Sequence, residues 1–390
     1  MENINSHVLE LFDEMKTIRR EIHKNPELLY ELPNTTSLVT TYLSSLSGVE
    51  VYSQVGRSGV IGVLKSDGGP CYLLRADMDA LAIQEENNVE YKSQIQGRMH
   101  ACGHDAHVAM LLIAAKVISN FREKLKGSLK FLFQPAEEGE FGAQAMINDP
   151  LYPALENPDV EQVYGLHITA SEKIGDVLIS SKYASCYSSY FYIDIIGKGG
   201  HASTPHLSID PIHAGAHIVL DINTILSKYV DPQTKASIAV TTFHSGEVFN
   251  AIPHICKISG TIRCFEPETK ETIEKRITNF CRGSEISFGC EIKLEFQNYY
   301  PPTINSPEPS QIAGNAFKKI CPGANINNLS PLIGEDFSYF TEKKPGCFIM
   351  MGCGDSQHTS HLHSSTFDFD ERAMLIGASY WVELVKDILT

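Results

Sequence analysis

Continuous apolar runs alternate with helical patterns through the first half of the chain. A helix is predicted at 6–24 and a second helical pattern at about 106–120. The strand-like runs are VIGVLK (60–65), CYLLRAD (71–77), KFLFQ (130–134) and VYGLHI (163–168). Their apolar residues are continuous rather than alternating with polar ones, which is typical of strands covered by helices on both faces. The pattern predicts an α/β domain with helices on both faces of a mixed sheet. Open sheets of this kind bind ligands at the carboxyl ends of their strands.

The order of predicted strands and helices changes between residues 187 and 300. The predicted elements there follow the order β-α-β-β-α-β of ferredoxin-like domains. Asp210 suits the N-cap of the first helix in this segment, and Pro211 suits its first turn. We therefore expect a ferredoxin-like α+β lid or dimerisation domain at 187–300. It would be inserted in a catalytic metal-binding domain formed by 1–186 and 301–390.

Composition narrows the range of partners. The length of 390 residues exceeds what one hydrophobic core usually supports, which agrees with two domains. The formal net charge of −15 disfavours nucleic acid and anionic membrane surfaces as partners. The most apolar run, at 108–115, is much too short to cross a bilayer. We expect no nucleic-acid or membrane partner.

The N-terminus and the cysteines indicate a cytoplasmic location. The first residues form a charged amphipathic stretch without the basic and apolar regions of a secretory signal. Ten cysteines stand at irregular spacing, unlike the dense framework of a small secreted domain. We expect most of them to be reduced and buried.

The strongest local motif is HACGHDAH at 100–107. It places a thiol, three imidazoles and a carboxylate within eight residues at the start of a helical pattern. Cysteine and histidine together suit zinc and other borderline metals. The alternative is a polar loop that caps the helix.

Carboxylates follow two of the predicted strands, in RADMDAL (75–81) and QPAEEGE (134–140). Of Glu137 and Glu138, one is suited to bind a metal and the other to take a proton from metal-bound water. Asp77 and Asp79 are suited either to ligate the metal or to orient a ligand imidazole. The alternatives are a solvated acidic turn for the glutamates and a structural role for the aspartates.

Histidines recur at two further places. His167 ends the strand-like run at 163–168, and His361 and His363 lie far downstream. A single histidine at a strand end is more often a core group than a ligand, and the downstream pair fits a surface as well as a site. A shared site is favoured because the acidic groups and His167 fall at the carboxyl ends of successive predicted strands.

Two features of the segment 187–300 are suited to bind substrate. GKGGHAS at 197–203 is rich in glycine but lacks the spacing of a phosphate-binding loop, so we interpret it as a tight turn that presents His201. Arg263 alternates with Ile262 and Cys264, so it should point to the opposite face of its strand. An arginine there is usually solvated, but its planar fork also fits a substrate carboxylate.

Taken together, these motifs resemble the M20 metallopeptidase family. RADMDAL, MHACGHDAH, QPAEEGE, GLH, GKGGHASTPH, FNAIP, GTIR, GEDFS and LHSSTFDFDE occur in the order and approximate spacing of that family, from about residue 10 to 385. The resemblance is strongest to its aminoacylase-like amidohydrolase branch, which includes N-acyl amino acid amidohydrolases, hippurate hydrolases and auxin-conjugate hydrolases. FHSGEVFNAIP departs from the usual pattern at His244 and Phe249, which reshapes the expected substrate pocket.

The resemblance implies a role for each matching residue. The metal ligands would be Cys102, His104, Glu138, His167 and His363. Glu137 would be the general base, and Asp79, or less clearly Asp77, would orient the metal-site residues. His201 would steady the oxyanion, in many relatives across a dimer interface, while Arg263 and Asn250 would hold the substrate carboxylate.

The implied activity is metal-dependent hydrolysis of the amide bond of an N-acyl amino acid. The cofactors would be two divalent ions per subunit, with zinc first and manganese, cobalt or nickel as alternatives. The resemblance also implies a homodimer formed through the lid. Three alternatives stay open: a metallo-carboxypeptidase or dipeptidase, a cysteine hydrolase with Cys102 as nucleophile, and a metal- or ligand-binding protein without turnover.

Overall fold

The structure is a computed structural model, and it describes residues 3–66, 68–328 and 330–390. The chain divides into two compact units. The first unit comprises Met1–Ala184, Thr303–Ser330 and Asp336–Thr390, and the second comprises Ser185–Pro302 and Pro331–Glu335. The short return of the chain to the second unit at Pro331–Glu335 has no counterpart in the sequence-based boundaries.

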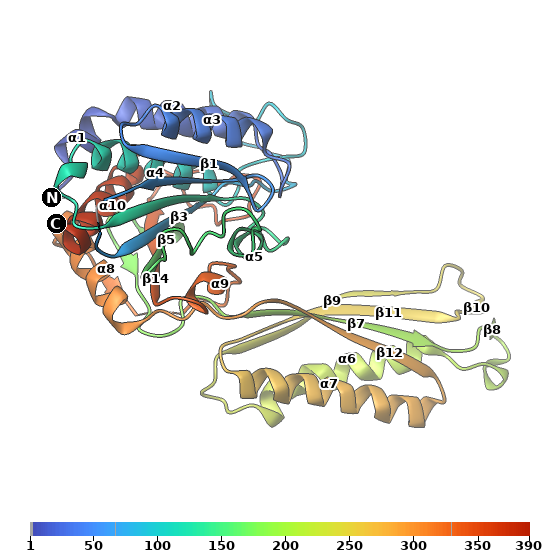
Figure 1. The fold of residues 1–390 in the computed structure, drawn as a ribbon. Helices are drawn as coiled ribbons and strands as arrows, with labels where there is room; N and C mark the ends of the chain where they lie inside the picture. The colour runs from blue at the N-terminus through green and yellow to red at the C-terminus, as the bar shows by residue number, and fades with distance from the viewer. Residues whose placement is uncertain (1–2, 67, 329) are drawn as a thin grey trace. The chain divides into compact units, whose positions relative to one another are not determined.

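The first unit is an α/β structure (Figure 1). Its helices are α1 (Ser6–Glu10), α2 (Phe12–Lys24), α3 (Pro33–Ser44), α4 (His104–Ser119), α5 (Gly142–Ile147), α8 (Pro307–Ile320), α9 (Ser338–Thr341) and α10 (Ala373–Leu389), with a 3-10 turn η1 (Arg122–Lys124). Its strands are β1 (Val49–Val55), β2 (Gly59–Leu64), β3 (Cys71–Asp77), β4 (Ser128–Gln134), β5 (Gln162–Lys173), β6 (Val177–Leu178), β13 (Ile326–Asn327) and β14 (Gly346–Gly354).

These strands form one mixed sheet with the order β1-β2-β4-β3-β5-β14-β6-β13. The central strands β4, β3, β5 and β14 run parallel to their neighbours within that group, whereas β2 runs antiparallel to β4. Parallel neighbours run in the same direction, so Asp77 at the end of β3, the acidic residues that follow β4 and His167 in β5 are brought to one edge.

Helices cover both faces of the sheet, as the continuous apolar runs predicted. On one face, Leu74, Phe131 and Ile349 join the core formed with α2, α4 and α10. Phe348, the neighbour of Ile349, points to the opposite face because side chains alternate along a strand. There it packs against Phe337 beside α9, with ring centroids 5.5 Å apart.

The second unit has the predicted element order, with two short additional strands. Its elements are β7 (Tyr187–Ile196), β8 (Gly200–His201), η2 (Pro205–Leu207), α6 (Pro211–Tyr229), β9 (Ala236–Ser245), β10 (Ala251–Ile252), β11 (Ile255–Cys264), α7 (Pro267–Phe288) and β12 (Glu291–Tyr300). The four-stranded antiparallel sheet has the order β12-β7-β11-β9, and α6 and α7 pack on it around Ile193, Ile218 and Ile277. Asp210 caps α6 by accepting a hydrogen bond from the backbone N–H of Ile212 (2.9 Å).

Two helix predictions need correction. The predicted helix at 6–24 is two helices, because the backbone at Leu11 departs from helical geometry (φ −99°, ψ 11°) between α1 and α2. The helix predicted from about 106 begins at His104, directly after Gly103. All ten cysteines are buried and none forms a disulfide bond, in line with the expectation that most are reduced and buried.

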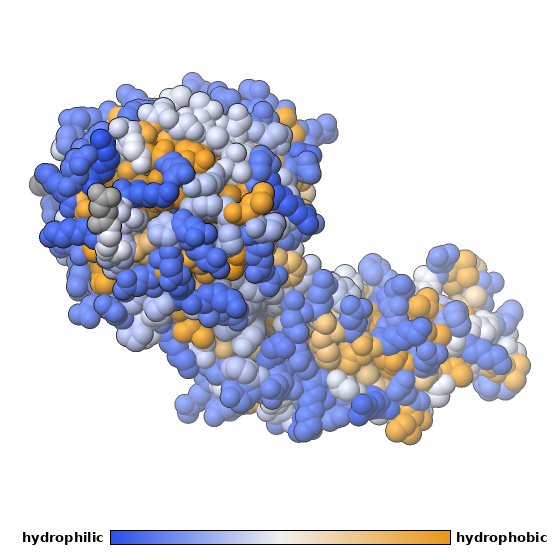
Figure 2. All heavy atoms as spheres, in the orientation of Figure 1, coloured by the Kyte–Doolittle hydropathy of each residue, from blue (hydrophilic) through white to orange (hydrophobic). Residues whose placement is uncertain are grey.

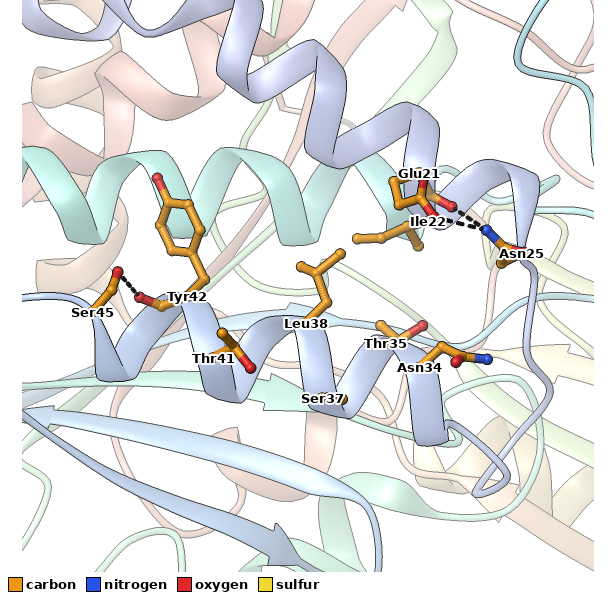
Figure 3. A pocket seen from close by; sticks show the side chains of 10 residues that line it. All are labelled: Glu21, Ile22, Asn25, Asn34, Thr35, Ser37, Leu38, Thr41, Tyr42 and Ser45. Atoms are coloured by element: carbon orange, nitrogen blue, oxygen red, sulfur yellow. Dashed lines mark hydrogen bonds between the residues drawn. The ribbon is translucent and has the colours of Figure 1, made fainter.

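A surface groove of about 570 Å³ runs between α2 and α3 (Figure 3). Its lining is mostly hydroxyl and amide side chains, and it contains one carboxylate, Glu21, and no histidine or cysteine. The groove therefore offers no set of metal ligands.

Within the described residues, no helix is both long and apolar enough to span a membrane.

Candidate metal centre and active site

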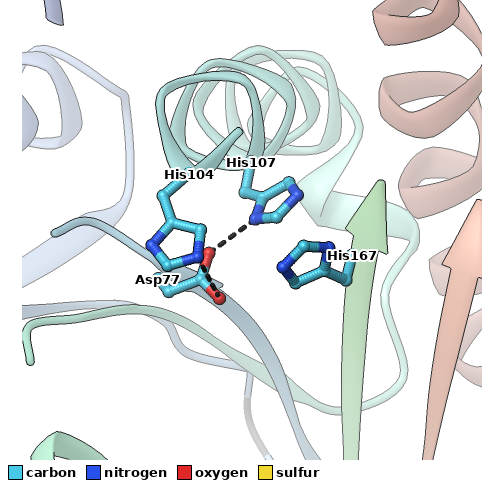
Figure 4. Close-up of side chains that lie close together, drawn as sticks. All are labelled: Asp77, His104, His107 and His167. Atoms are coloured by element: carbon cyan, nitrogen blue, oxygen red, sulfur yellow. Dashed lines mark hydrogen bonds and ion pairs between the residues drawn. The ribbon is translucent and has the colours of Figure 1, made fainter. Parts of the chain in front are cut away.

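The predicted chemistry of the first unit converges at the carboxyl edge of its sheet. Asp77 ends β3, and His167 lies within β5. His104 and His107 project from the first turn of α4 toward these two residues (Figure 4). One ligand-capable atom from each of the four lies within 4.8 Å of the others. The four side chains are buried.

Cys102 lies at the centre of the predicted ligand set. Its Sγ is 3.4 Å from Nε2 of His167 and 3.3 Å from Nε2 of His363. Burial raises the pKa of the Cys102 thiol well above its usual value, and Glu138 and Glu137 raise it further. A thiolate at this position therefore requires a nearby positive charge.

Glu138 joins the same group from the turn after β4. Its Oε1 is 3.3 Å from Nε2 of His363 and 3.9 Å from Nε2 of His104. The structure thus brings together all five residues predicted as metal ligands. His363 is about half exposed whereas the other four are largely buried, so the cluster is open on the His363 side.

Hydrogen bonding fixes which ring nitrogen of His167 faces the cluster. Its Nδ1 lies 2.6 Å from the carbonyl oxygen of Ile168, so Nδ1 carries the proton and donates it there. The lone pair is consequently on Nε2, the atom that faces Cys102. Ligand histidines are commonly oriented in this way by a backbone carbonyl.

His107 has no role in the sequence-based prediction, although it belongs to the HACGHDAH motif. Its Nδ1 bonds Oδ1 of Asp77 (2.5 Å), and its Nε2 accepts the backbone N–H of Ile168 (3.0 Å). Both ring nitrogens are therefore engaged, so His107 supports the cluster rather than ligating a metal. The signal in the sequence is its spacing of three from His104, which puts both rings on one side of a helix.

Asp77 is held by a buried network that sequence reasoning also missed. Arg75 donates through Nη1 to Oδ2 of Asp77 (2.6 Å) and through Nη2 to Oδ1 of Asp336 (3.0 Å). Burial raises the pKa of Asp77, but Arg75, His104 and His107 outweigh burial and hold it well below its usual range. The only sequence signal was a charged arginine inside an otherwise apolar strand.

Asp79 fixes the turn that carries the two glutamates. Its Oδ1 accepts the backbone N–H of Glu137, and its Oδ2 accepts that of Glu138, both at 3.1 Å. Glu137 is buried beside Glu138. This contact defines the position of both carboxylates relative to the end of β3.

Left-handed backbone occurs at three positions in or beside the ligands. Ala136 and His363 have positive φ angles of 53° and 65°, and Gly103, between Cys102 and His104, has a φ of 84°. A Cβ on Gly103 would lie 2.5 Å from the side chain of Ile168. Strained backbone of this kind persists where the surrounding structure determines it, and it clusters at functional sites.

Asp105, next to His104, anchors the start of α4 to α2. Its Oδ2 is 2.8 Å from Nε of Arg19 and 2.8 Å from Nδ1 of His23, both on α2. All three side chains are buried. Burial raises the pKa of Asp105, but the charges of Arg19 and His23 hold it well below its usual range.

The cluster fits divalent cations. Among the described residues, no hydrogen-bond partner reaches the two ring nitrogens of His104 or Oε1 of Glu138, although these atoms are buried. Burial lowers the pKa of His104, but Asp77, Asp79 and Glu138 raise it to about 10. The surplus of buried negative charge and the unsatisfied nitrogen and oxygen atoms are what bound cations would satisfy.

The substrate-binding residues predicted in the second unit are lightly packed. His201 is exposed and belongs to β8, which pairs with β10, so the predicted tight turn is a short strand. Its Nδ1 accepts the backbone N–H of Ser203 (3.1 Å), which leaves the proton of a neutral ring on Nε2. The carbonyl of Asn250 accepts the N–H of Ala202 (3.1 Å), so His201 and Asn250 are neighbours.

Arg263 lies on β11, facing away from the buried Ile262 and Cys264, as its alternation predicted. Its Nη2 donates to the hydroxyl of Tyr190 (3.3 Å), and the guanidinium lies 5.2 Å from the centroid of the same ring. Tyr190 thus supports the planar face of the arginine, Nη1 donates to the backbone carbonyl of Ile262 (3.0 Å), and the side chain is partly exposed.

The chain belongs to Peptidase family M20/M25/M40, whose model matches residues 73–387. The resemblance carried by the motifs is thereby confirmed, and the protein is a hydrolase that acts on amide bonds. It is 36% identical to hippurate hydrolase of Campylobacter jejuni over 99% of this chain and 100% of that protein. It is also 36% identical to thermostable carboxypeptidase 1 of Saccharolobus solfataricus, over 97% of this chain and 96% of that protein.

Solved structures agree with this assignment. The Bacillus subtilis YXEP protein, described as a dinuclear metal binding peptidase from the M20 family, matches with a TM-score of 0.82 and 28% identity. The match covers 97% of this chain and 98% of that one. The two-domain α/β fold predicted from the sequence is therefore confirmed.

Proposed function

We propose that this protein hydrolyses the amide bond of N-acyl amino acids, releasing a carboxylic acid and a free amino acid. The observation that carries the proposal is the largely buried cluster of Cys102, His104, Glu138 and His167, closed by the half-exposed His363 and lying beside a further carboxylate, Glu137. Hippurate is an N-acylated glycine, and a carboxypeptidase cuts the amide before a terminal amino acid. Both relatives therefore point to an amide whose amine side is an amino acid with a free carboxylate.

We propose that the five clustered residues hold two divalent ions, with zinc as the first candidate and manganese, cobalt or nickel as alternatives. The mixture of thiolate, imidazole and carboxylate donors supports a borderline metal. Bound ions of this type acidify a water molecule and polarise an acyl carbonyl. Asp79 positions Glu137 and Glu138 through their backbone N–H groups.

Glu137 is the general base of the proposed reaction. One of its carboxylate oxygens takes a proton from the attacking water and later delivers that proton to the nitrogen of the leaving amine. Its place directly before a proposed ligand, on a turn that Asp79 holds rigid, supports this role. The water oxygen ends in the new carboxylic acid, and the proton ends on the amine, so the reaction balances.

His201, Asn250 and Arg263 complete the proposal. With Nδ1 engaged by Ser203, neutral His201 offers an Nε2–H to the oxyanion of the tetrahedral intermediate. The fork of Arg263, backed by Tyr190, suits the carboxylate of the amino acid, with Asn250 as a second donor.

We also propose a homodimer formed through the second unit. β9 is an edge strand of its sheet, and unpaired strand edges favour pairing with a second copy. Large apolar side chains are exposed on this unit, among them Leu220, Phe249 and Ile286. Orange apolar patches are visible on the face of this unit shown in Figure 2. Sedimentation analysis tests the dimer. We propose a cytoplasmic location as well, supported by ten cysteines of which none forms a disulfide bond.

The test of reaction class is a substrate panel. N-acetyl, N-benzoyl and indoleacetyl amino acids are compared with dipeptides, using protein stripped with chelator and reloaded with each candidate metal. Metal-restored cleavage of the N-acyl amino acids is expected. Cleavage of dipeptides alone would favour the carboxypeptidase or dipeptidase alternative, and activity indifferent to chelator would make Cys102 a nucleophile. Absence of all hydrolysis with metal bound would leave a binding protein.

A further inference from the structure

The turn between β1 and β2 lies at the same sheet edge as the metal cluster. β2 runs antiparallel to β4, and Val60 near the start of β2 pairs with Phe133 near the end of β4. Glu137 follows β4 by three residues. The turn at 56–58 is therefore at the rim of the proposed active site.

This turn is held in a strained conformation. Arg57 has a φ of 82°, a left-handed value that side-chain-bearing residues rarely adopt. The flanking residues are fixed, since the backbone N–H of Gly56 donates to Asp149 (2.9 Å) and the carbonyl of Ser58 accepts from the hydroxyl of Thr36 (2.7 Å). Strain that the surroundings impose on an exposed residue suggests that the position of its side chain matters.

The Arg57 guanidinium faces solvent, and no carboxylate among the described residues neutralises its charge. It lies 4.3 Å from the ring centroid of Tyr30 and is exposed. Among the described residues, none forms an ion pair with it. Stacking on an aromatic ring fixes the plane of the guanidinium while leaving its N–H fork free to bind an anion.

Tyr30 connects this cation to the loop of the proposed base. Its hydroxyl donates to the backbone carbonyl of Glu140 (2.7 Å), and the carbonyl of the preceding Leu29 accepts the N–H of Ala136 (3.1 Å). Burial raises the pKa of Tyr30. Arg57 opposes this, whereas the charges of Asp336, Glu140 and Asp79 add to it. The phenol thus lies within the field of the acidic site.

We propose that Arg57, supported by Tyr30, recognises a second carboxylate of the substrate, in addition to the carboxylate of the amino acid that is released. This inference rests on the proposed function. The acidic groups around Glu137 repel a substrate with an extra negative charge, and an unpaired guanidinium at the rim compensates for that repulsion. The extra carboxylate has two sources, a dicarboxylic acyl group or an acidic amino-acid side chain.

Isosteric substrate pairs distinguish the sources. N-succinyl-leucine is compared with N-succinamoyl-leucine, and N-acetylglutamate with N-acetylglutamine, in the zinc- or manganese-loaded enzyme. The measured quantity is the ratio of kcat/KM for the charged substrate to that for its neutral isostere. Arg57→Asn is expected to lower this ratio about fivefold in one of the pairs, because an exposed ion pair contributes at most about that factor. Asparagine tolerates the left-handed backbone, so the turn is retained.

Three further variants sharpen the test. Arg57→Lys keeps the charge without the planar fork and should lie between wild type and Arg57→Asn. Tyr30→Leu removes the support of the guanidinium and should lower the same ratio, mainly through KM. Arg122→Asn is the matched control. Arg122 is a partly exposed arginine, paired with Glu123, that lies beyond the end of α4, away from the edge where His104 begins that helix. It should leave the ratio unchanged.

Each outcome is decisive. A ratio that Arg57→Asn leaves unchanged in both pairs, with hydrolysis intact, overturns the role of Arg57 but not the proposed function. An effect confined to a third pair, N-acetyl-leucine against N-acetyl-leucinamide, overturns the assignment to a second carboxylate. A metal-loaded wild-type enzyme that hydrolyses none of these substrates overturns both the proposed function and this inference.

Discussion

The two units organise their candidate residues in opposite ways. In the first unit, the proposed ligands are mostly buried, and their supports, such as Asp77, Asp79 and Asp105, are fixed by several hydrogen bonds or ion pairs. In the second unit, His201 is exposed on a two-residue strand, and Arg263 is partly exposed, with hydrogen bonds to the hydroxyl of Tyr190 and to backbone carbonyls but no ion pair among the described residues. Metal binding and proton transfer require side chains that are already fixed before substrate binds, whereas substrate recognition tolerates side chains that are more exposed and have fewer contacts.

The largest effect is expected at Glu137. Glu137→Gln keeps the size and hydrogen-bonding capacity of the side chain but removes its ability to take a proton. A loss of about 10³-fold or more in kcat is expected, with metal content unchanged. Steady-state kinetics and elemental analysis of the same samples measure both quantities. Glu140→Gln, an exposed glutamate on the same turn, is the control and should remain close to wild type.

The buried ion pair of Asp105 at the start of α4 should contribute to the free energy of unfolding. Asp105→Asn removes one partner of a buried ion pair and should cost about 3 kcal/mol at pH 7. The pKa of Asp105 is lowered on folding, so its contribution is fully present above the unfolded pKa of about 3.9 and is lost as the pH falls toward the folded pKa. The difference between wild type and variant should therefore shrink below about pH 4. Thermal melts from pH 7 to pH 3 measure it, and a constant difference would refute the assignment.

In the second unit, replacing His201 should lower activity without changing the stability of the protein. His201→Asn is expected to lower kcat about 10²-fold, the usual effect of losing one oxyanion donor, while metal content and melting temperature stay the same. His206→Asn, an exposed histidine a few residues away, is the matched control. An equal loss in both variants would show that the effect comes from the segment rather than from the His201 ring.

The smallest effect concerns the backbone between two ligands. Gly103→Ala should destabilise the protein by about 2 kcal/mol and weaken metal retention, because φ is 84° and the new Cβ would meet Ile168 at 2.5 Å. Gly97→Ala is a close control, since Gly97 has a φ of 73° but no atom within 4 Å of the added Cβ. Chemical denaturation measures the free energy of unfolding of both variants. The cost of a positive φ is common to both, so the difference between them gives the steric cost at Gly103.

The sequence predicted the elements well where burial alone determines them. The strand at 71–77 has the predicted bounds, and it is buried along its whole length because helices cover both faces of the sheet. The break at Leu11 was not visible, because neither glycine nor proline marks it. The return of 331–335 to the second unit was missed as well, since five residues carry no periodicity.

The same limit applies to the site. Residue types and spacing indicated a metal site at HACGHDAH and beside the two glutamates, but the set of five ligands was implied only by the resemblance to the M20 family. His107 was missed as a support because its role depends on Asp77 and Ile168, which only the fold brings to it. The Arg75–Asp336 pair joins positions far apart in the chain, and no local pattern predicts such a contact.

The most direct test of the central claim is a metal titration of chelator-stripped protein, with ion content per subunit and hydrolysis of N-benzoylglycine measured on the same samples. The account predicts no activity in stripped protein and its recovery as the ion content approaches two per subunit. It also predicts that Cys102→Ala loses bound metal and activity together. Full activity without bound metal, or a Cys102→Ala variant that binds two ions but is inactive, would contradict the claim that Cys102 is a metal ligand rather than a nucleophile.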